Sequence, residues 1–282
     1  MLRWYRSRRK AYPWRSRPKP YGVLVSEFML QQTQASRVAP AYQRFMRRFP
    51  TVVALASATR AEVVREWRGL GYNRRAVALS EAARAIVRDH GGQVPSDPEE
   101  LIRLPGVGRY TADAVASFAY GKAVPAVDAN VRRIAARAEL GIEGYEVSQE
   151  RIQQIAAEWL DTRDPSAWNQ ALMDLGREVC RPHPRCSLCP LRNGCRFHAM
   201  GRIPGANPRR QKPFPGSFRQ LRGRVLDLLR GGPATVGRLS TAAGRPPDRV
   251  AQALVTLQKD GLIRASAGAL VGNPRGRAAL CE

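Results

Sequence analysis

The most informative segment of the chain is residues 104–133, LPGVGRYTADAVASFAYGKAVPAVDANVRR. The segment DPEE at 97–100 is typical of a helix start, Gly106 and Gly108 interrupt that helix, and a second helix is predicted over Arg109–Tyr120. Two glycines separated by one residue let the backbone turn tightly, so its amides and the next helix N-terminus point at a phosphate. The stretch predicts a helical hairpin that grips a DNA backbone, through Gly106, Gly108 and Arg109, without reading its sequence. An ordinary glycine-containing helix connection is the alternative for the G-V-G turn alone.

Asp128 lies twenty residues after Gly108, at the start of the next predicted helix, Asn130–Leu140. A capping Asp is commonplace by itself, but here it follows the hairpin within the motif V-D-A-N. The combination resembles the helix-hairpin-helix plus Gly/Pro-Asp signature of the base-excision DNA glycosylase superfamily. The resemblance implies that Asp128, with Asn130 beside it, is catalytic and stabilises the oxocarbenium-like sugar that forms as an N-glycosidic bond breaks.

Two further motifs narrow the resemblance. SEFMLQQTQ at 26–34 and GLGY at 69–72 are similar to segments of adenine DNA glycosylases of the MutY type. The resemblance implies that Gln31 and Tyr72 wedge into the duplex near an extruded base, against the alternatives of a solvated Gln and a core Tyr. It also implies that YPWR at 12–15 helps to line an adenine pocket through Trp14 and Arg15.

Glu27 is the second predicted catalytic carboxyl group. It lies between VLV at 23–25 and FML at 28–30, in an apolar helix where an ionised carboxylate would be costly. The resemblance implies that Glu27 protonates a ring nitrogen of flipped adenine and then helps to activate water, which is general acid catalysis. Glu27 and Asp128 would divide the work, one protonated to donate and one ionised to stabilise positive charge.

Tyr110 occupies the position that decides whether the DNA strand is cut. Related bifunctional glycosylases carry a lysine there, two residues after the G-V-G turn, and its amine forms a Schiff base with the sugar. Because a phenol cannot form an imine, the sequence predicts a monofunctional enzyme that leaves an abasic site. Adenine and mismatch-specific thymine glycosylases both accept Tyr at this position, so Tyr110 does not select the base.

Four cysteines lie within sixteen residues: Cys180, Cys186, Cys189 and Cys195. With no signal peptide in the Arg-rich start, they favour a metal site over a disulfide framework. The spacing C-x5-C-x2-C-x5-C is one residue short, in its first gap, of the run that holds a [4Fe-4S] cluster in endonuclease III and MutY proteins. The resemblance implies such a cluster; zinc or a degenerate site is the alternative, and His183 is a weak rival ligand.

The charge of the chain favours a polyanionic partner. Lys and Arg number 47 against 23 Asp and Glu, which gives a net charge of +24. An Arg-rich composition from a GC-rich genome is the alternative source of part of this excess. No apolar run approaches the ~20 residues of a membrane span. The expectation is a monomer in the cytoplasm, associated with the nucleoid, that binds double-stranded DNA containing a mispair or an oxidised guanine.

The fold class predicted is all-α, with two helical subdomains on either side of a cleft, an iron-sulfur cluster loop and a small C-terminal winged helix. The first subdomain is assigned helices over Gly22–Gln34, Ser36–Arg48, Thr51–Ala56, Arg60–Trp67 and Asn73–His90. The winged helix is assigned helices over Phe218–Leu229, Val236–Ala243 and Pro247–Asp260 and a hairpin of Leu262–Ala265 with Ala269–Val271. The domains are a disordered basic arm (1–20), a glycosylase domain (21–200, with the cysteine loop 180–195), a linker (201–216) and a winged-helix-like domain (217–282).

Three functions remain open at this point. The first is removal of adenine opposite 8-oxoguanine or guanine, although a Nudix-like domain that reads 8-oxoguanine is not recognisable in the sequence. The second is a thymine or uracil mismatch glycosylase, which Ala129 favours because MutY proteins commonly have V-D-G-N. The third is a non-catalytic iron-sulfur DNA-binding regulator, which the two intact carboxyl groups disfavour. The winged helix is expected to bind duplex DNA through Arg245, Arg249 or Lys259, or else to dock a protein.

Overall fold

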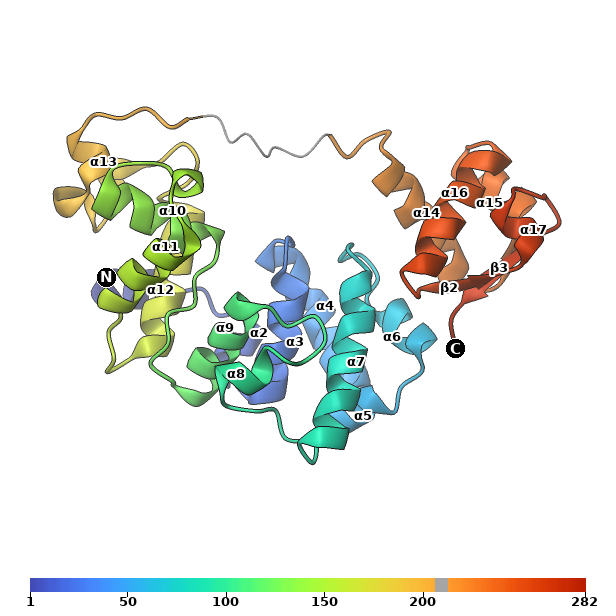
Figure 1. Ribbon diagram of the computed structural model, residues 1–282, viewed down its shortest axis with the longest axis horizontal. Coiled ribbons are helices and arrows are strands. Elements are labelled where there is room, and N and C mark those ends of the chain that lie inside the picture. The colour runs from blue at the N-terminus through green and yellow to red at the C-terminus, as the bar shows by residue number, and fades with distance from the viewer. Residues whose placement is uncertain (206–212) are drawn as a thin grey trace. The chain divides into compact units, whose positions relative to one another are not determined.

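A computed structural model describes residues 1–205 and 213–282, and most of them are helical (Figure 1). By their internal contacts the described residues divide into two units. Residues 1–27, 94–103 and 107–205 form the first unit, and residues 28–93, 104–106 and 213–282 form the second. Glu27, Tyr110 and Asp128 belong to the same unit, although 101 residues of sequence separate the two carboxyl groups.

The first unit is helical throughout its regular structure. Its elements are α1 (Leu2–Arg8), α2 (Pro13–Ser16), most of α3 (Pro20–Leu30), α8 (Pro98–Leu101), α9 (Arg109–Tyr120), α10 (Ala129–Ala135) with the π-helix Ala136–Leu140, α11 (Gln149–Glu158), α12 (Pro165–Glu178) and α13 (Arg196–Ala199). Branched aliphatic side chains from α10, α11 and α12 form its core, among them Val131, Ile134, Ile155, Leu172 and Leu175. Helix α12 contacts both α9 and α10, and so it underlies the residues after the hairpin.

The prediction of a disordered N-terminal arm is wrong for residues 2–8 and 13–16, which form α1 and α2. Tyr5 and Trp14 are buried, and the Tyr5 hydroxyl donates a 2.8 Å hydrogen bond to Gln170 of α12. The many arginines suggested a disordered segment, but burial of these two aromatic side chains stabilises its folded form. The segment is therefore part of the first unit.

In the second unit, the helices before the hairpin are α4 (Ala35–Arg48), α5 (Val52–Ala56), α6 (Arg60–Glu66) and α7 (Arg74–Asp89). Thr51 caps α5, and Thr59 with Glu62 forms a capping box on α6. The predicted helix over 22–34 ends earlier, at Leu30, because Gln32 has a left-handed backbone with φ of 54°. The remaining predicted helices of this unit agree with the structure to within two residues at each end.

The C-terminal part of the second unit contains α14 (Phe218–Arg230), β1 (Ala234–Thr235), α15 (Val236–Ala243), α16 (Pro247–Lys259), β2 (Ile263–Ala265), α17 (Ala267–Leu270) and β3 (Arg277–Leu280). The strands form an antiparallel sheet in the order β1-β3-β2, with Ile263 opposite Leu280. Three helices and a small sheet match the order expected of a winged helix (Figure 1).

The predicted second strand, Ala269–Val271, is wrong. Ser266 caps a short helix instead, because its hydroxyl accepts a hydrogen bond from the Ala269 amide. The strand that pairs with β2 is β3, which begins further along the chain, at Arg277. Part of the predicted linker, residues 206–212, lies outside the described residues. Within the described ranges, the helices are all too short or too polar to span a membrane.

Candidate active site

The glycine turn of the hairpin leaves helix α9 with an open N-terminus. Gly106 has a φ of 74°, and a Cβ there would lie 2.6 Å from the Ala78 Cβ, so only glycine fits. Gly108 is the N-cap of α9, provides no side-chain cap and has open space where a Cβ would lie. The amides of the first helical turn therefore remain available to an anion.

Arg109, predicted to contact DNA, begins helix α9. Its guanidinium lies 2.6 Å from a Glu99 oxygen and 3.1 Å from an Asp113 oxygen. These pairs hold a half-exposed cation at the turn, next to the open helix terminus. A phosphate bound there would meet the helix amides, and it would compete with the two carboxylates for the guanidinium of Arg109.

Glu27, on α3, is a buried carboxyl group whose side chain meets Tyr110. The residue is only 3% exposed, and the Tyr110 hydroxyl donates a 2.9 Å hydrogen bond to Glu27 Oε2. The pKa of Glu27 is raised to about 7, because burial and the nearby Asp128 raise it by more than the Tyr110 hydrogen bond and Arg15 lower it. A carboxyl group with this pKa carries a proton in much of the population at neutral pH, as a general acid must.

Asp128 has a different environment, because it is the N-cap of helix α10. Its Oδ1 accepts from the amides of Asn130 and Val131 at 2.8 and 2.7 Å, and its Oδ2 accepts from Asn130 Nδ2 at 2.8 Å. Burial raises the pKa of Asp128, and these three donors oppose that rise by stabilising the ionised form. The environment of Glu27 therefore favours its protonated form, whereas Asp128 has hydrogen-bond donors that stabilise its ionised form.

The predicted residue Asn130 is held by an arginine that the sequence did not single out. Arg133 Nη2 donates at 2.8 Å to Asn130 Oδ1 and to the Gly176 carbonyl, and Arg133 Nε donates to the Cys180 carbonyl at 2.7 Å. Helix α12 approaches closely here, because a Cβ on Gly176 would lie 2.4 Å from the Asn130 Cβ. Asn130 and Arg133 are three positions apart in one helix, which places them on the same helix face.

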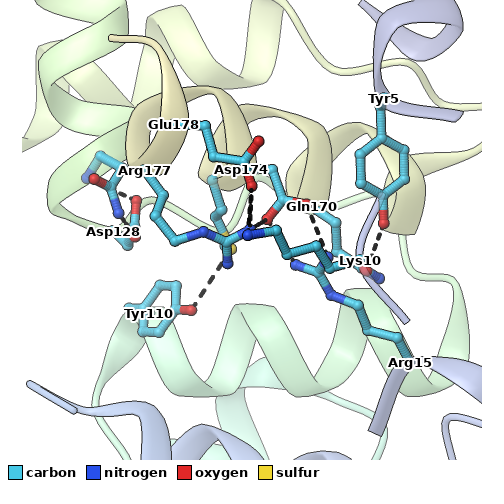
Figure 2. Close-up of polar contacts among 11 residues, drawn as sticks. Tyr5, Lys10, Arg15, Tyr110, Asp128, Gln170, Asp174, Arg177 and Glu178 are labelled. Carbon is cyan, nitrogen blue, oxygen red and sulfur yellow. Dashed lines mark hydrogen bonds and ion pairs between the residues drawn. The ribbon is translucent and has the colours of Figure 1, made fainter. Parts of the chain in front are cut away.

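Asp174 is the second residue that sequence reasoning missed. Arg15 donates to both of its carboxylate oxygens, at 2.8 and 2.9 Å, and Arg177 Nη2 lies 2.9 Å from Oδ1 (Figure 2). The Asp174 side chain is 4% exposed, and a buried bidentate pair of this kind fixes both partners. Arg15 also lies over Tyr12, whose ring stacks on Trp14 at 4.9 Å.

The two predicted wedge residues, Gln31 and Tyr72, are joined through Arg75. This buried arginine donates to the carbonyl oxygens of Phe28, Met29, Gln31, Leu70 and Gly71 and to the Thr33 hydroxyl. Its guanidinium also lies 5.6 Å from the centre of the Tyr72 ring. Tyr72 itself is 45% exposed, so the alternative of a core tyrosine is wrong.

The four clustered cysteines are free thiols that line one cavity, together with Arg137, Phe197 and His198. His183 is exposed and does not line it. Arg137 explains how the shortened first gap folds, because its guanidinium donates to the Arg181 and Pro182 carbonyls at 2.8 and 3.1 Å. Four unpaired thiols around one cavity are the type of ligand that an iron-sulfur cluster takes. Among the described residues, however, no three Cys, His, Asp or Glu side chains are arranged so that they could hold a metal ion.

Comparisons with known proteins place the chain in a family. The model of the HhH-GPD superfamily of base excision DNA repair proteins matches residues 25–161. The adenine DNA glycosylase of Mycolicibacterium smegmatis is 42% identical over 95% of this chain and 92% of its own length. The chain belongs to the adenine DNA glycosylases. The human member is 41% identical over 70% of this chain and 38% of its own length.

Solved structures give the same fold. A thermostable thymine-DNA glycosylase superposes with a TM-score of 0.66 at 29% identity, covering 71% of this chain and 93% of the other. Endonuclease III in a non-covalent DNA complex superposes with a TM-score of 0.61 at 24% identity and the same coverage. The predicted all-α, helix-hairpin-helix glycosylase fold is thereby confirmed for this adenine glycosylase family member.

Proposed function

We propose that the protein removes adenine mispaired with 8-oxoguanine or guanine and leaves an abasic site. The observation that carries the proposal is Glu27, a buried carboxyl group with a pKa of about 7 that lies in the same unit as Asp128. Adenine must first leave the base stack, since its glycosidic bond is inaccessible inside the duplex. Trp14 and Arg15 would line the adenine pocket, and Gln31 and Tyr72 would occupy the space near the extruded base.

In the proposed reaction the Glu27 carboxyl group gives its proton to a ring nitrogen of adenine. The bond between the sugar C1′ and the base nitrogen then breaks, and its electron pair leaves with the neutral base. The Asp128 carboxylate, held by Asn130 and Val131, stabilises the oxocarbenium-like sugar. Water adds to C1′, and its proton returns to the Glu27 carboxylate, so that the enzyme ends in its starting state.

Tyr110 supports hydrolysis without strand cleavage. Its hydroxyl donates a hydrogen bond to Glu27, and the side chain has no amine that could form a Schiff base with the sugar. The proposed product is therefore an intact strand with an abasic site, which breaks only after treatment with alkali.

The test of this function uses labelled duplexes containing A:8-oxoguanine, A:G, T:G and U:G, each incubated with the purified protein and analysed with and without alkali. Breakage of the adenine strand only after alkali is the expected result. Breakage without alkali would overturn the monofunctional assignment. Release of thymine or uracil with adenine untouched would favour the mismatch alternative, which the thymine-DNA glycosylase fold and Ala129 support. No release of any base would favour the regulator.

We further propose that Cys180, Cys186, Cys189 and Cys195 hold a [4Fe-4S] cluster. When bound, the cluster would supply a rigid anchor for its loop and present basic residues such as Arg181, Arg185 and Arg192 to DNA phosphates; it takes no part in hydrolysis.

The protein should contain about four irons and four sulfides per chain. Iron and zinc analysis of the wild type and of Cys189→Ser checks this, with Cys281→Ser as the control, since Cys281 lies outside the cavity. One zinc per chain, or equal iron in the wild type and Cys189→Ser, would contradict the cluster.

The partner proposed is double-stranded DNA that carries a mispair or an oxidised guanine, bound by a monomer. Gly106, Gly108 and Arg109 would meet the backbone, supported by the open N-terminus of α9 and the net charge of +24. This substrate would place the protein with the nucleoid in the cytoplasm.

A further inference from the structure

Residues 217–282, called the C-terminal domain below, share a hydrophobic core with helices α6 and α7. Ala61 and Val64 of α6 and Val77 of α7 are buried in one cluster with the C-terminal domain. The partners in that cluster include Leu221, Val225, Leu226, Leu229, Leu254 and Leu257. A continuous core of this kind fixes the domain against α6 and α7 instead of leaving it free on its linker.

Arginines reinforce this contact. Arg230, the last residue of α14, donates from Nε to the Val64 carbonyl at 3.0 Å and from Nη2 to Asn73 Oδ1 at 2.8 Å. Arg230 also pairs with Asp227 on its own helix, and its side chain is only 7% exposed. In addition, Arg60 donates to the Gly261 carbonyl at 3.3 Å, and Arg74 lies 3.5 Å from Asp260.

Asn73 connects this contact to the proposed wedge. It directly follows Tyr72 and is the N-cap of α7, yet its side chain makes no capping hydrogen bond. The side-chain oxygen Oδ1 of Asn73 instead accepts a hydrogen bond from Arg230, which lies 157 residues later in the C-terminal domain. The preceding residue, Tyr72, has a φ of 45°, a backbone conformation that a bulky side chain adopts only when its surroundings enforce it.

Arg75 and Arg230 therefore hold the loop from Gly69 to Asn73 at different positions along the chain, in addition to Arg37, which binds the Gly69 carbonyl. Arg75 binds the carbonyls of Leu70 and Gly71, before the wedge tyrosine, and the carbonyl of Tyr72 itself. Arg230 binds the side chain of Asn73, after it. Because Arg75 belongs to α7 and Arg230 to α14, only the second restraint depends on the C-terminal domain.

We propose that the C-terminal domain is a brace for the wedge, and that Arg230 is the positioning residue through which it holds Tyr72 ready for insertion into the duplex. The inference rests on the proposed function in so far as it needs an extruded base, whichever base that is. It gives the domain a role in stabilising the flipped state that does not require the domain to touch the damaged pair.

The test is a set of variants read by base flipping and by single-turnover base release. Arg230→Ala and Asn73→Ala should each lower the fraction of flipped 2-aminopurine, placed at the target position, by roughly tenfold, as expected for loss of a charge-assisted hydrogen bond. The double variant should be no worse than Arg230→Ala alone, because that variant already removes the contact with Asn73. Asn73→Ala leaves the C-terminal core and the capping of α7 unchanged, so it remains informative if Arg230→Ala folds poorly.

The matched control is Arg224→Ala, which removes an exposed arginine from the same helix, and its flipping signal should equal that of the wild type. The decisive background is Tyr72→Ala, in which Arg230→Ala should have no further effect on flipping or release. If Arg230→Ala lowered flipping equally with and without Tyr72, the brace proposal would be wrong. It would also be wrong if the effects of Arg230→Ala and Asn73→Ala were simply additive. If the wild type released thymine and not adenine, the proposed function would fail while this comparison could still be made on that substrate.

Discussion

Glu27→Gln is expected to lower the single-turnover rate of adenine release by roughly 10²–10⁴-fold, the usual contribution of a positioned general acid. Glutamine has nearly the same shape and accepts the Tyr110 hydrogen bond, but it has no proton to give to the base. Duplex affinity should not change, and thermal stability should be equal or higher, because the variant removes an ionisable group that is costly to bury. Loss of rate together with loss of folding or binding would contradict the assignment.

The pH dependence of the wild type follows from the same carboxyl group. Burial raises the pKa of Glu27 to about 7, so the protonated, active form is complete at lower pH and disappears as the pH rises above that value. The single-turnover rate should fall about tenfold per unit above about pH 7, and it should fall again at low pH, where the Asp128 carboxylate gains a proton. Tyr110→Phe removes a hydrogen bond that lowers this pKa, so its falling limb should shift to higher pH. A rate that instead rises through pH 7 would make Glu27 a base in the limiting step.

Local sequence was sufficient to predict the features of the site that depend only on residues next to one another in the chain. The glycine turn and the capping role of Asp128 could be predicted because each is a property of a few consecutive residues. The burial of Glu27 could be predicted from the apolar residues on both sides of it. These are the features for which backbone conformation and local hydrophobicity decide the structure.

The residues that hold the site in place could not be predicted in the same way. Arg133, Asp174 and Arg230 each act through a partner more than 40 residues distant, at 43, 159 and 157 residues. An arginine in a chain with 47 basic residues gives no local sign of which carbonyl or carboxylate it will bind. The errors at residues 2–8, 13–16 and 269–271 have a related cause, since tertiary packing and one serine cap outweighed composition.

Asp128→Asn is expected to lower the rate of base release by at least about 100-fold, the effect of removing one preorganised electrostatic group from a charged transition state. The substitution removes the charge and keeps the helix cap, because asparagine is as good an N-cap as aspartate and its oxygen still accepts from the amides of Asn130 and Val131. It also removes the hydrogen bond from Asn130 Nδ2 to Oδ2, which an amide NH2 cannot accept. Single-turnover release and duplex binding, measured side by side, should show a slow enzyme that binds normally.

The matched control is Asp164→Asn. Asp164 caps α12 through the Ala167 amide in the same unit, so this variant removes a capping carboxylate outside the site and should release adenine at the wild-type rate. If the two variants lost activity equally, the effect would belong to helix capping and not to the reaction. If Asp128→Asn lost binding but kept its rate, the carboxylate would serve the fold of α10 alone. A large loss confined to Asp128→Asn is what a carboxylate facing a cationic sugar requires, since no hydrogen bond replaces its charge.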